Sequence, residues 1–442
     1  MNDTVVLGGG VSGLAAGISS GAVVFEASEA PGGICSSYYL RPGSTERLTA
    51  PPEDGEVYRF EIGGGHWIFG LDPHLRKFLG GFCELKNYSR HSSAFFPGTG
   101  HLVPYPVQNH LSHFGPAFAV ESLAQIEALA SSEGGAPTMS EWLEATFGGR
   151  LCDAFFHPFH RLYTAGLWEK IAPQDQYKTP VDLARVRAGA CGDGAAVGYN
   201  ATFAYPADGL DSMIARMAER CDLRLRKRAA RVNTVRREIE FSDGTGAKYA
   251  QLISTLPLNK IEKLCGFPAL RQPDPGPAVL VLNLGARKGP RAPSEQWLYI
   301  PESRAGFHRV GFYSNVDPSF LPHSHRADGS RVSVYVEKAY PEGDGLSPAA
   351  AEQWTASVAG ELQEWGWIGD VEAADPTWIE VAYTWSWPGS TWKTEALARL
   401  EHAGVYCVGR YARWTFQGIA ESIRDGLVAG MGNSDLSVAR RS

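Results

Sequence analysis

The segment Gly8-Gly9-Gly10-Val11-Ser12-Gly13 decides the fold, and it follows an apolar run that predicts a strand from Asp3 to Leu7. Gly8 permits a tight turn, Gly10 lets the backbone approach a pyrophosphate, and Gly13 lets a helix pack closely on the strand. The residues after the turn are small, which suits such a helix. Its N-terminus would present free N–H groups to anionic phosphates. We therefore predict a strand–turn–helix unit that binds a dinucleotide.

A second strand is expected from Ala22 to Phe25, and it ends in Glu26. An acidic residue at that place accepts hydrogen bonds from the ribose hydroxyls of a dinucleotide. A second glycine pair follows at Gly32-Gly33, where another stretch of backbone could approach the cofactor. The predicted cofactor-binding residues in this part of the chain are Gly8, Gly10, Val11, Ser12, Gly13, Glu26, Ala27, Gly32 and Gly33.

The composition is that of an ordinary globular protein. The 442 residues suffice for two or three domains with substantial cores. The formal net charge of −7 argues against non-specific nucleic-acid binding, so no nucleic-acid partner is expected. No stretch approaches the ~20 apolar residues of a membrane span, and the first apolar run is too short for a signal peptide. We expect a cytoplasmic protein with no membrane partner.

The seven cysteines are scattered, and none forms a Cys-x-x-Cys pair. Such a set fits a reducing cytosol better than a disulfide framework. His157 and His160 are three residues apart and could share a helix face, but no further residues with metal-ligand spacing accompany them. We therefore predict no metal site.

Periodicity along the chain predicts three regions. Apolar residues at helical spacing indicate an inserted helical domain, and a series of apolar strands indicates an antiparallel sheet that would form a substrate groove. The fold class is therefore α/β. The expected boundaries are 110–190 for the helical domain and 91–109 and 273–399 for the sheet domain, and residues 1–90 begin a Rossmann-like nucleotide domain.

Several segments resemble the glutathione-reductase-like FAD proteins, and in particular the branch that contains amine oxidases and nucleotide-sugar mutases. Ile253 to Leu258 resembles the strand end that lies beside the flavin, Val405 to Arg410 the last strand, and Gly418 to Ala429 the final helix. The resemblance implies FAD as the cofactor and a discontinuous nucleotide domain made of residues 1–90, 200–272 and 400–442. It adds these cofactor-binding residues: Gly64, Gly65, His66, Val232, Thr255, Gly409, Arg410, Gly418, Ile419 and Ser422.

More specific motifs resemble the UDP-galactopyranose mutases, closer to the eukaryotic type. Gly64-Gly65-His66-Trp67-Ile68-Phe69 is similar to the mutase Gly-Gly-His-x-Ile-Phe loop, whose histidine lies near the flavin. Val103 to Asn109 is similar to Val-Pro-Tyr-Pro-Phe-Gln-Asn, and Asn200 to Pro206 to Asn-Ala-Thr-Phe-x-Phe-Pro. Trp297-Leu298-Tyr299, followed by Arg309, resembles the central substrate strands. The likeness spans most of the chain.

This resemblance implies a mutase that interconverts the pyranose and furanose forms of a nucleoside-diphosphate sugar, UDP-galactose or a related sugar. N5 of the reduced FAD would attack the anomeric carbon and expel the nucleoside diphosphate, and the sugar would re-close through another hydroxyl. The net reaction is redox-neutral, although NAD(P)H or another reductant must first reduce the flavin. The protein would bind and orient the substrate and supply charge.

The detached diphosphate needs cations and hydroxyl donors. The resemblance assigns catalytic roles to His66, Arg309 and Tyr299, and a gapped match gives Arg185, with Arg187 as the alternative, as an arginine on a mobile loop. Expected substrate-binding residues are Tyr105, Gln108, His160, Asn200, Trp297, Tyr299, Arg309, Tyr383 and Phe416. A homo-oligomer is possible.

Two departures bear on the substrate. Phe416 stands where the family places a tyrosine after the last strand, and Pro158-Phe159-His160 replaces Pro-Tyr-Asn. A different nucleotide sugar, such as a deoxy or amino sugar, is therefore open. The main alternative function is an FAD-dependent oxidoreductase of the amine-oxidase or protoporphyrinogen-oxidase type, which would share the glycine motifs. A non-enzymatic binding module of the Rab GDP-dissociation-inhibitor kind is disfavoured by the intact glycine turn and Glu26.

Overall fold

The computed structural model describes residues 4–130, 135–174, 181–194, 200–268, 270–343 and 345–432. A five-stranded parallel sheet forms the base of the nucleotide-binding region, with the first strand at its centre. The apolar residues Val5, Val6 and Leu7 of that strand are buried. The sheet order is β19 (Val405–Cys407), β13 (Gln251–Ser254), β1 (Thr4–Leu7), β2 (Val23–Phe25) and β9 (Leu223–Arg224).

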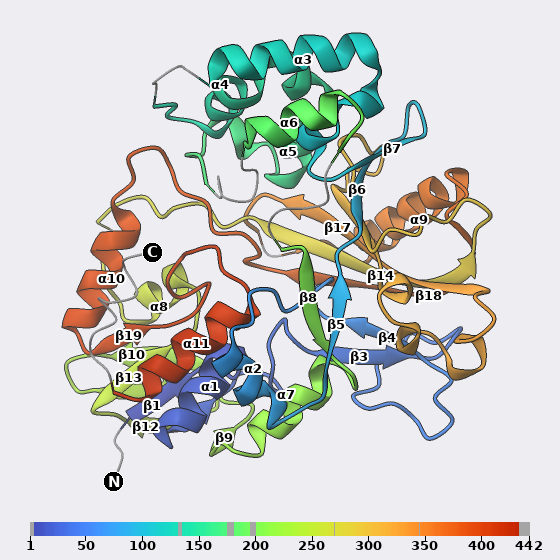
Figure 1. Ribbon diagram of the computed structural model, residues 1–442. Coiled ribbons are helices and arrows are strands. Elements are labelled where there is room, and N and C mark those ends of the chain that lie inside the picture. Colours follow the sequence, from blue (N-terminus) through green and yellow to red (C-terminus); the bar gives the residue numbers. More distant parts are fainter. Residues whose placement is uncertain are drawn as a thin grey trace.

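Helices α1 (Val11–Ser20) and α11 (Ile419–Gly430) pack against each other beside this sheet (Figure 1). They approach closely because Gly426 has no side chain, since a Cβ there would lie 2.2 Å from the carbonyl oxygen of Ser12. This contact brings the last helix of the chain onto the helix that follows the first glycine turn.

Smaller elements complete the nucleotide-binding region. Helices α8 and α10 pack against each other, and α10 also packs against β19. A three-stranded antiparallel sheet lies beside α8. The elements are α2 (Pro73–Gly80), α7 (Leu210–Ala218), β10 (Ala229–Asn233), β11 (Glu238–Phe241), β12 (Gly246–Lys248), α8 (Leu258–Leu264) and α10 (Trp392–His402).

A seven-stranded sheet forms the second layer, and its neighbouring strands are antiparallel except for one parallel pair, β15 with β6. The long strand β14, next to the edge strand β18, is buried over most of its length. The order is β18 (Ile368–Ile379), β14 (Ala278–Lys288), β17 (Arg331–Tyr340), β16 (Arg309–Phe312), β15 (Trp297–Tyr299), β6 (Ser92–Phe96) and β7 (His101–Pro104).

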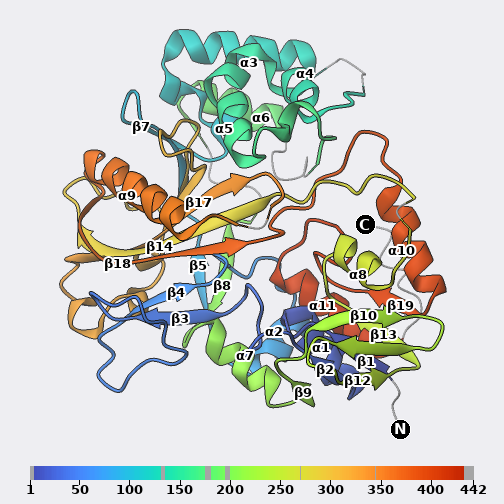
Figure 2. The same ribbon diagram turned by 180° about the vertical axis from the view of Figure 1, so that it is seen from behind.

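One helix lies among the strands of this layer, in the segment 275–395 that was expected to be strand-rich. Helix α9 (Pro348–Glu364) covers a face of the sheet (Figure 2), and Trp354, Val358 and Leu362 are buried in the core with it. Its start is a standard one, with Pro348 in the first turn and the Ser347 hydroxyl accepting a hydrogen bond from the Ala350 N–H. The expected strands are present in this segment, and α9 is an additional element that the sequence pattern did not reveal.

The third layer is helical and lies at the top of Figure 1. A capping box at Thr138 starts α4, where the Thr138 hydroxyl accepts from the Glu141 N–H and the Glu141 carboxylate accepts from the Thr138 N–H. The helices are α3 (Pro116–Leu129), α4 (Met139–Leu151), a π-helical turn at Cys152–Phe156, α5 (His157–Tyr163) and α6 (Leu183–Ala190).

Two antiparallel strand pairs complete the fold: β3 (Ser37–Leu40) with β4 (Tyr58–Glu61), and β5 (Leu85–Ser89) with β8 (Thr202–Pro206). The architecture confirms the predicted α/β class, with a parallel sheet for the nucleotide and a large antiparallel sheet. The domain boundaries stay a prediction.

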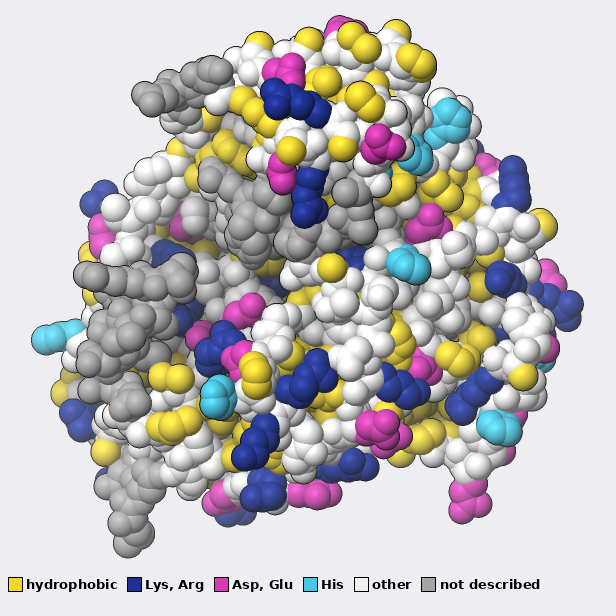
Figure 3. Space-filling view, in the orientation of Figure 1, with side chains coloured by type: hydrophobic (Ala, Val, Ile, Leu, Met, Phe, Trp, Pro, Cys, Tyr) yellow, Lys and Arg dark blue, Asp and Glu magenta, His cyan; other side chains and the backbone are white. Residues whose placement is uncertain are grey.

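The outer surface carries acidic and basic side chains interspersed over the face shown in Figure 3. Within the described ranges, no helix combines the length and the apolar character needed to cross a membrane.

Candidate active site

The first glycine turn and Glu26 form a cradle of the kind that holds a dinucleotide. Gly8 has φ +101°, and a Cβ on Gly13 would lie 1.8 Å from the Gly8 carbonyl oxygen, so both positions require glycine. The Glu26 carboxylate accepts hydrogen bonds from the N–H groups of Gly9 (2.6 Å) and Ser28 (2.8 Å). These two bonds hold Glu26 at the end of β2.

The second glycine pair rests directly on this turn. The Gly32 N–H donates to the Gly9 carbonyl at 2.8 Å, and Gly10 and Gly32 form an isolated bridge. Gly32 and Gly33 both have positive φ values, 108° and 58°. The structure thus explains why the pair follows the ribose acid so closely, because it closes one side of the cradle.

A cavity of about 840 Å³ runs from the cradle to the antiparallel sheet and the helical layer. Most of the residues predicted from sequence meet in it. Cofactor residues that line it are Gly8, Gly10, Val11, Ser12, Glu26, Gly32, Gly33, Gly65, His66, Thr255, Gly409, Arg410, Gly418, Ile419 and Ser422. Substrate residues that line it are Tyr105, His160, Asn200, Trp297, Tyr299, Arg309, Tyr383 and Phe416.

The His66 loop lies between the cradle and strand β17. A Cβ on Gly64 would lie 2.9 Å from Glu337 Oε1, and one on Gly65 would lie 2.2 Å from the Tyr335 hydroxyl oxygen, so the loop sits flush on the sheet. His66 Nδ1 donates to the Gly64 carbonyl at 3.2 Å, which leaves Nε2 as an acceptor. Burial lowers the pKa of His66 to about 4, so the ring is neutral at pH 7.

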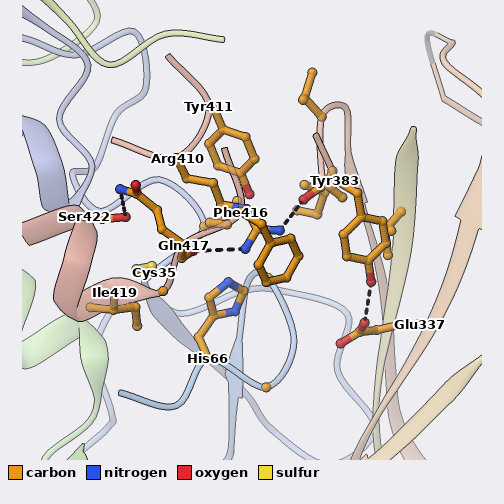
Figure 4. A pocket seen from close by; sticks show the side chains of 18 of the residues that line it. Cys35, His66, Glu337, Tyr383, Arg410, Tyr411, Phe416, Gln417, Ile419 and Ser422 are labelled. Carbon is orange, nitrogen blue, oxygen red and sulfur yellow. Dashed lines mark hydrogen bonds between the residues drawn. The ribbon is translucent and has the colours of Figure 1, made fainter. Parts of the chain in front are cut away.

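Arg410 follows the last parallel strand and is held by two backbone carbonyls, those of Gln417 (3.2 Å) and Ala382 (3.0 Å) (Figure 4). Its guanidinium stands 4.1 Å from the centre of the Phe416 ring, a cation–π distance. Phe416 therefore lies in the cavity where the resemblance expected a tyrosine, but its contribution is a ring face toward Arg410 and no hydroxyl.

The second arginine of the cavity, Arg309, is paired with a buried carboxylate. Its Nε donates to Glu337 Oε2 at 3.0 Å and its Nη2 to the same oxygen. The Tyr383 hydroxyl also donates to this oxygen, at 3.4 Å (Figure 4), and it contacts His308 Nε2 at 3.2 Å. Because the carboxylate can only accept, the Tyr383 proton points to Glu337, and the Tyr383 oxygen must then accept from His308. We therefore assign the proton on His308 to Nε2.

Three aromatic rings of one helical segment form the opposite wall. Phe155, Phe159 and Tyr163 recur every four residues, and their neighbouring rings stack at 5.3 and 5.4 Å between centres. Phe159 meets Tyr299 edge-on at 5.6 Å, and Tyr163 meets Tyr383 at 4.8 Å. His160, on the same helix, donates from Nδ1 to the Phe156 carbonyl at 2.7 Å.

Other predicted residues do not line the cavity in the described parts of the chain. Gln108 is fully buried beside it, and Val232 is buried in the core beneath the parallel sheet. Arg185 lies on α6 with Asp182 at 3.4 Å, and Arg187 reaches Glu127. Ala27, Gly13 and Gly64 do not line the cavity either. Gly13 packs against Gly8 and Gly64 against Glu337, and both of these neighbours do line it.

Sequence reasoning missed Arg90, Glu337, His308 and the aromatic wall. Glu337 directly follows the apolar run Val334-Tyr335-Val336 within β17, and an acid after such a run is the available signal. The spacing of Phe155, Phe159 and Tyr163 was visible but could equally have been core packing. Arg90 carries no local signal of a role in the site, since Trp297 and Tyr299, which it contacts in the cavity, are far along the chain.

The family model described as flavin containing amine oxidoreductase matches residues 15–429. The chain belongs to this family. Its cofactor is FAD, and the cradle, the small second glycine pair and the N-terminus of α11 provide a site of the required kind. A search among curated proteins gave no match.

Solved structures share the fold. A reduced UDP-galactopyranose mutase superposes with a TM-score of 0.84 at 20% identity, covering 97% of this chain and 95% of that one. A protein provisionally described as a protoporphyrinogen oxidase from Exiguobacterium sp. 255-15 gives 0.69 at 16%, with 98% of each chain covered. A putrescine oxidase variant gives 0.58 at 15%, covering 97% and 98%. At these identities the likeness establishes the fold alone.

Within the described residues, no group of three or more His, Cys, Asp or Glu side chains is placed to hold a metal ion.

Proposed function

We propose that this flavoprotein is a mutase that interconverts the pyranose and furanose forms of a nucleoside-diphosphate sugar, UDP-galactose or a related sugar. One observation carries the proposal. Arg309, Tyr299 and Tyr105 lie in the same cavity as the cradle and the His66 loop. A cation and two phenols beside the flavin site suit a diphosphate that must be held while it is detached from the sugar. Oxidation of an amine has no such requirement.

The residues of the chain would divide the work. Arg309, fixed by Glu337, would contact a phosphate with the guanidinium nitrogen that Glu337 does not engage. Tyr299 and Tyr105 would donate hydroxyl hydrogen bonds, while Trp297 and Asn200 would face the sugar. The aromatic wall of Phe155, Phe159 and Tyr163 would exclude water from the detached sugar and diphosphate.

Bound FAD, reduced by NAD(P)H or another reductant, would supply the nucleophile for the anomeric carbon. His66 is neutral and donates to Gly64, so its free Nε2 can accept a proton or hydrogen bond but does not add charge. Arg410, held by two carbonyls, adds positive charge to the same cavity. The proposal involves no nucleic acid or membrane, and a homo-oligomer stays a prediction.

The test is an anaerobic incubation of dithionite-reduced enzyme with a panel of UDP-, TDP- and GDP-sugars, followed by separation of pyranose and furanose forms. Oxidised enzyme is the matched control, since it should convert nothing. A new furanose from one donor would support the mutase and name its substrate. No conversion from any donor would reject it.

A second function is favoured by a different observation. Tyr163, Tyr383 and Trp385 enclose one end of the cavity, with ring centres 4.8 to 6.0 Å apart, and oxidases of this family enclose amines in aromatic cages. An FAD-dependent amine-oxidase or protoporphyrinogen-oxidase type of oxidoreductase is therefore the alternative. Reduction of the oxidised flavin by an amine or another small molecule, together with no sugar conversion, would establish it.

A further inference from the structure

Arg90 lies in the connection between β5 and β6 and lines the cavity, although only 7% of it is exposed. Its backbone N–H donates to the Ala201 carbonyl at 2.8 Å, and its Nε donates to the Ser92 hydroxyl at 3.0 Å. The first bond fixes the backbone of Arg90, and the second fixes its guanidinium. It stands 5.4 Å from the centre of the Tyr105 ring and 5.3 Å from that of Trp297.

The Tyr299 hydroxyl oxygen receives two hydrogen bonds in this arrangement. Trp297 Nε1 donates to it at 3.2 Å and Arg90 Nη2 donates to it at 3.5 Å. An indole N–H and a guanidinium can only donate. With two donors on its oxygen, the Tyr299 proton has to point elsewhere, and Tyr299 is half-buried with the cavity in front of it.

Tyr383 provides the contrast within the same cavity. Its hydroxyl proton is already directed to Glu337, at 3.4 Å. It would have to leave that carboxylate before it could donate to a ligand. Tyr299 needs no such change, because Arg90 and Trp297 have already turned its proton outward.

The charge of Arg90 adds to this effect. A donor bonded to a hydroxyl oxygen polarises the O–H and strengthens it as a donor in turn. Arg309 is engaged differently, because its Nε and Nη2 both donate to Glu337. Arg90 is therefore a second source of positive charge beside the cavity, and its Nη2 lies on the Tyr299 hydroxyl.

We infer that Arg90 is a positioning residue that orients and polarises the Tyr299 hydroxyl as a hydrogen-bond donor for the diphosphate of the ligand. The inference rests on the proposed function, because it takes the ligand to be a nucleoside diphosphate. Arg90 acts through Tyr299 and does not itself touch the phosphate. The effect of Arg90 on ligand affinity must then disappear when the Tyr299 hydroxyl is absent.

The experiment is a double-mutant cycle on the oxidised, FAD-loaded protein. Affinities of UDP, CDP, GDP and dTDP are measured by calorimetry for the wild type, and the tightest of the four is used with Arg90→Met, Tyr299→Phe and the double variant. We expect Arg90→Met to weaken binding ~10-fold, in line with a charge-assisted hydrogen bond. The double variant should be no weaker than the weaker single variant, within about twofold.

The cycle of Arg90→Met with Tyr383→Phe is the matched control, and there the two losses should multiply. Flavin absorbance and melting temperature show whether each variant is folded. If Arg90→Met does not retain FAD, Arg90→Gln takes its place with the same criteria.

Multiplying losses for Arg90 and Tyr299, or an Arg90 variant that binds like the wild type, would overturn the inference and leave the proposed function standing. A wild type that binds none of the four nucleoside diphosphates would instead reject the proposed function, and this inference with it.

Discussion

Arg309 donates from two nitrogens, Nε and Nη2, to one oxygen of Glu337. Glu337 is 3% exposed, and burial by itself raises its pKa. The Arg309 guanidinium outweighs this effect and lowers the pKa to about 2. The pair is therefore charged at every working pH, and it presents the rest of the guanidinium to the cavity in one orientation.

Glu337→Gln should lower the free energy of unfolding by about 3 kcal/mol, because it leaves a buried guanidinium without its counter-charge. Urea unfolding followed by fluorescence measures this. The matched control is Glu364→Gln, which removes the partner of Arg304 from a pair that is more than half exposed, and should cost less than about 1 kcal/mol. Equal losses of unfolding free energy in the two variants would contradict the expectation that burial makes the Arg309–Glu337 pair matter more.

Arg309→Ala should lower the rate of sugar conversion by a factor that corresponds to about 3 kcal/mol of transition-state stabilisation, as for removal of a preorganised donor. FAD binding should be unchanged, because Arg309 belongs to the sheet and not to the cradle. Turnover and flavin absorbance are measured on the same sample. Near-wild-type turnover of the variant would contradict the proposed role of Arg309 in holding the diphosphate.

Gly13→Ala should abolish stable FAD binding, because the new Cβ would lie 1.8 Å from the Gly8 carbonyl oxygen. Relief of that overlap must distort the turn, at a cost of about 2 kcal/mol or more. The flavin-to-protein absorbance ratio of the purified protein reports the outcome. Gly80→Ala is the control, since a Cβ there meets nothing within 4 Å, and it should bind FAD like the wild type.

Glu61 gives a pH dependence of the opposite sign to that of Glu337. Glu61 is fully buried, and burial raises its pKa to about 7. Its contribution to stability is complete below the unfolded pKa of ~4.3 and is lost as the pH rises through 7. Glu61→Gln stays neutral at every pH. Between pH 4.5 and 8 its free energy of unfolding should therefore rise relative to that of the wild type by up to about 3 kcal/mol.

Denaturant unfolding across that range provides the test for Glu61. A stability difference between wild type and Glu61→Gln that does not change with pH would show that the carboxyl is not titrating there. Tyr205 and Ser37 donate to Glu61, so Ser37→Ala is a useful second variant that removes a bond and keeps the carboxyl.

Flavin redox state should control sugar conversion completely. Oxidised enzyme should be inactive, and dithionite or NAD(P)H should switch it on without being consumed in proportion to product, because the proposed reaction is redox-neutral. Product formation and reductant consumption are followed together under argon. Equal activity of the two redox forms would exclude a flavin nucleophile.

The nucleotide-binding part could be predicted from sequence because its requirements are local. Gly8, Gly13 and Glu26 are each demanded by backbone geometry or by a hydrogen bond within a few turns of chain. Such requirements leave a readable spacing. The dinucleotide site and the strand–turn–helix order followed from that spacing, whereas periodicity along the chain indicated the fold class and the resemblance to FAD proteins implied the cofactor.

The remainder of the site depends on contacts between distant segments. Arg90 and Tyr299 are 209 positions apart, and Tyr205 and Glu61 are 144 apart, so no window of sequence displays the pair. Helix α9 is a different case. Its Ser347-Pro348 start was readable, but the apolar strands on either side of it dominated the pattern.

The His66 loop lies so close to β17 that neither Gly64 nor Gly65 has room for a Cβ. These two positions therefore tolerate little change, in contrast to the aromatic wall of the cavity. A side chain at either glycine would displace Glu337 or Tyr335 together with the His66 loop. The wall of Phe155, Phe159 and Tyr163 comes instead from one short helical run, and Phe159 faces the ring of Tyr299. Under the proposed function, substitutions in that run could change which ligand the cavity accepts while the two glycines stay as they are.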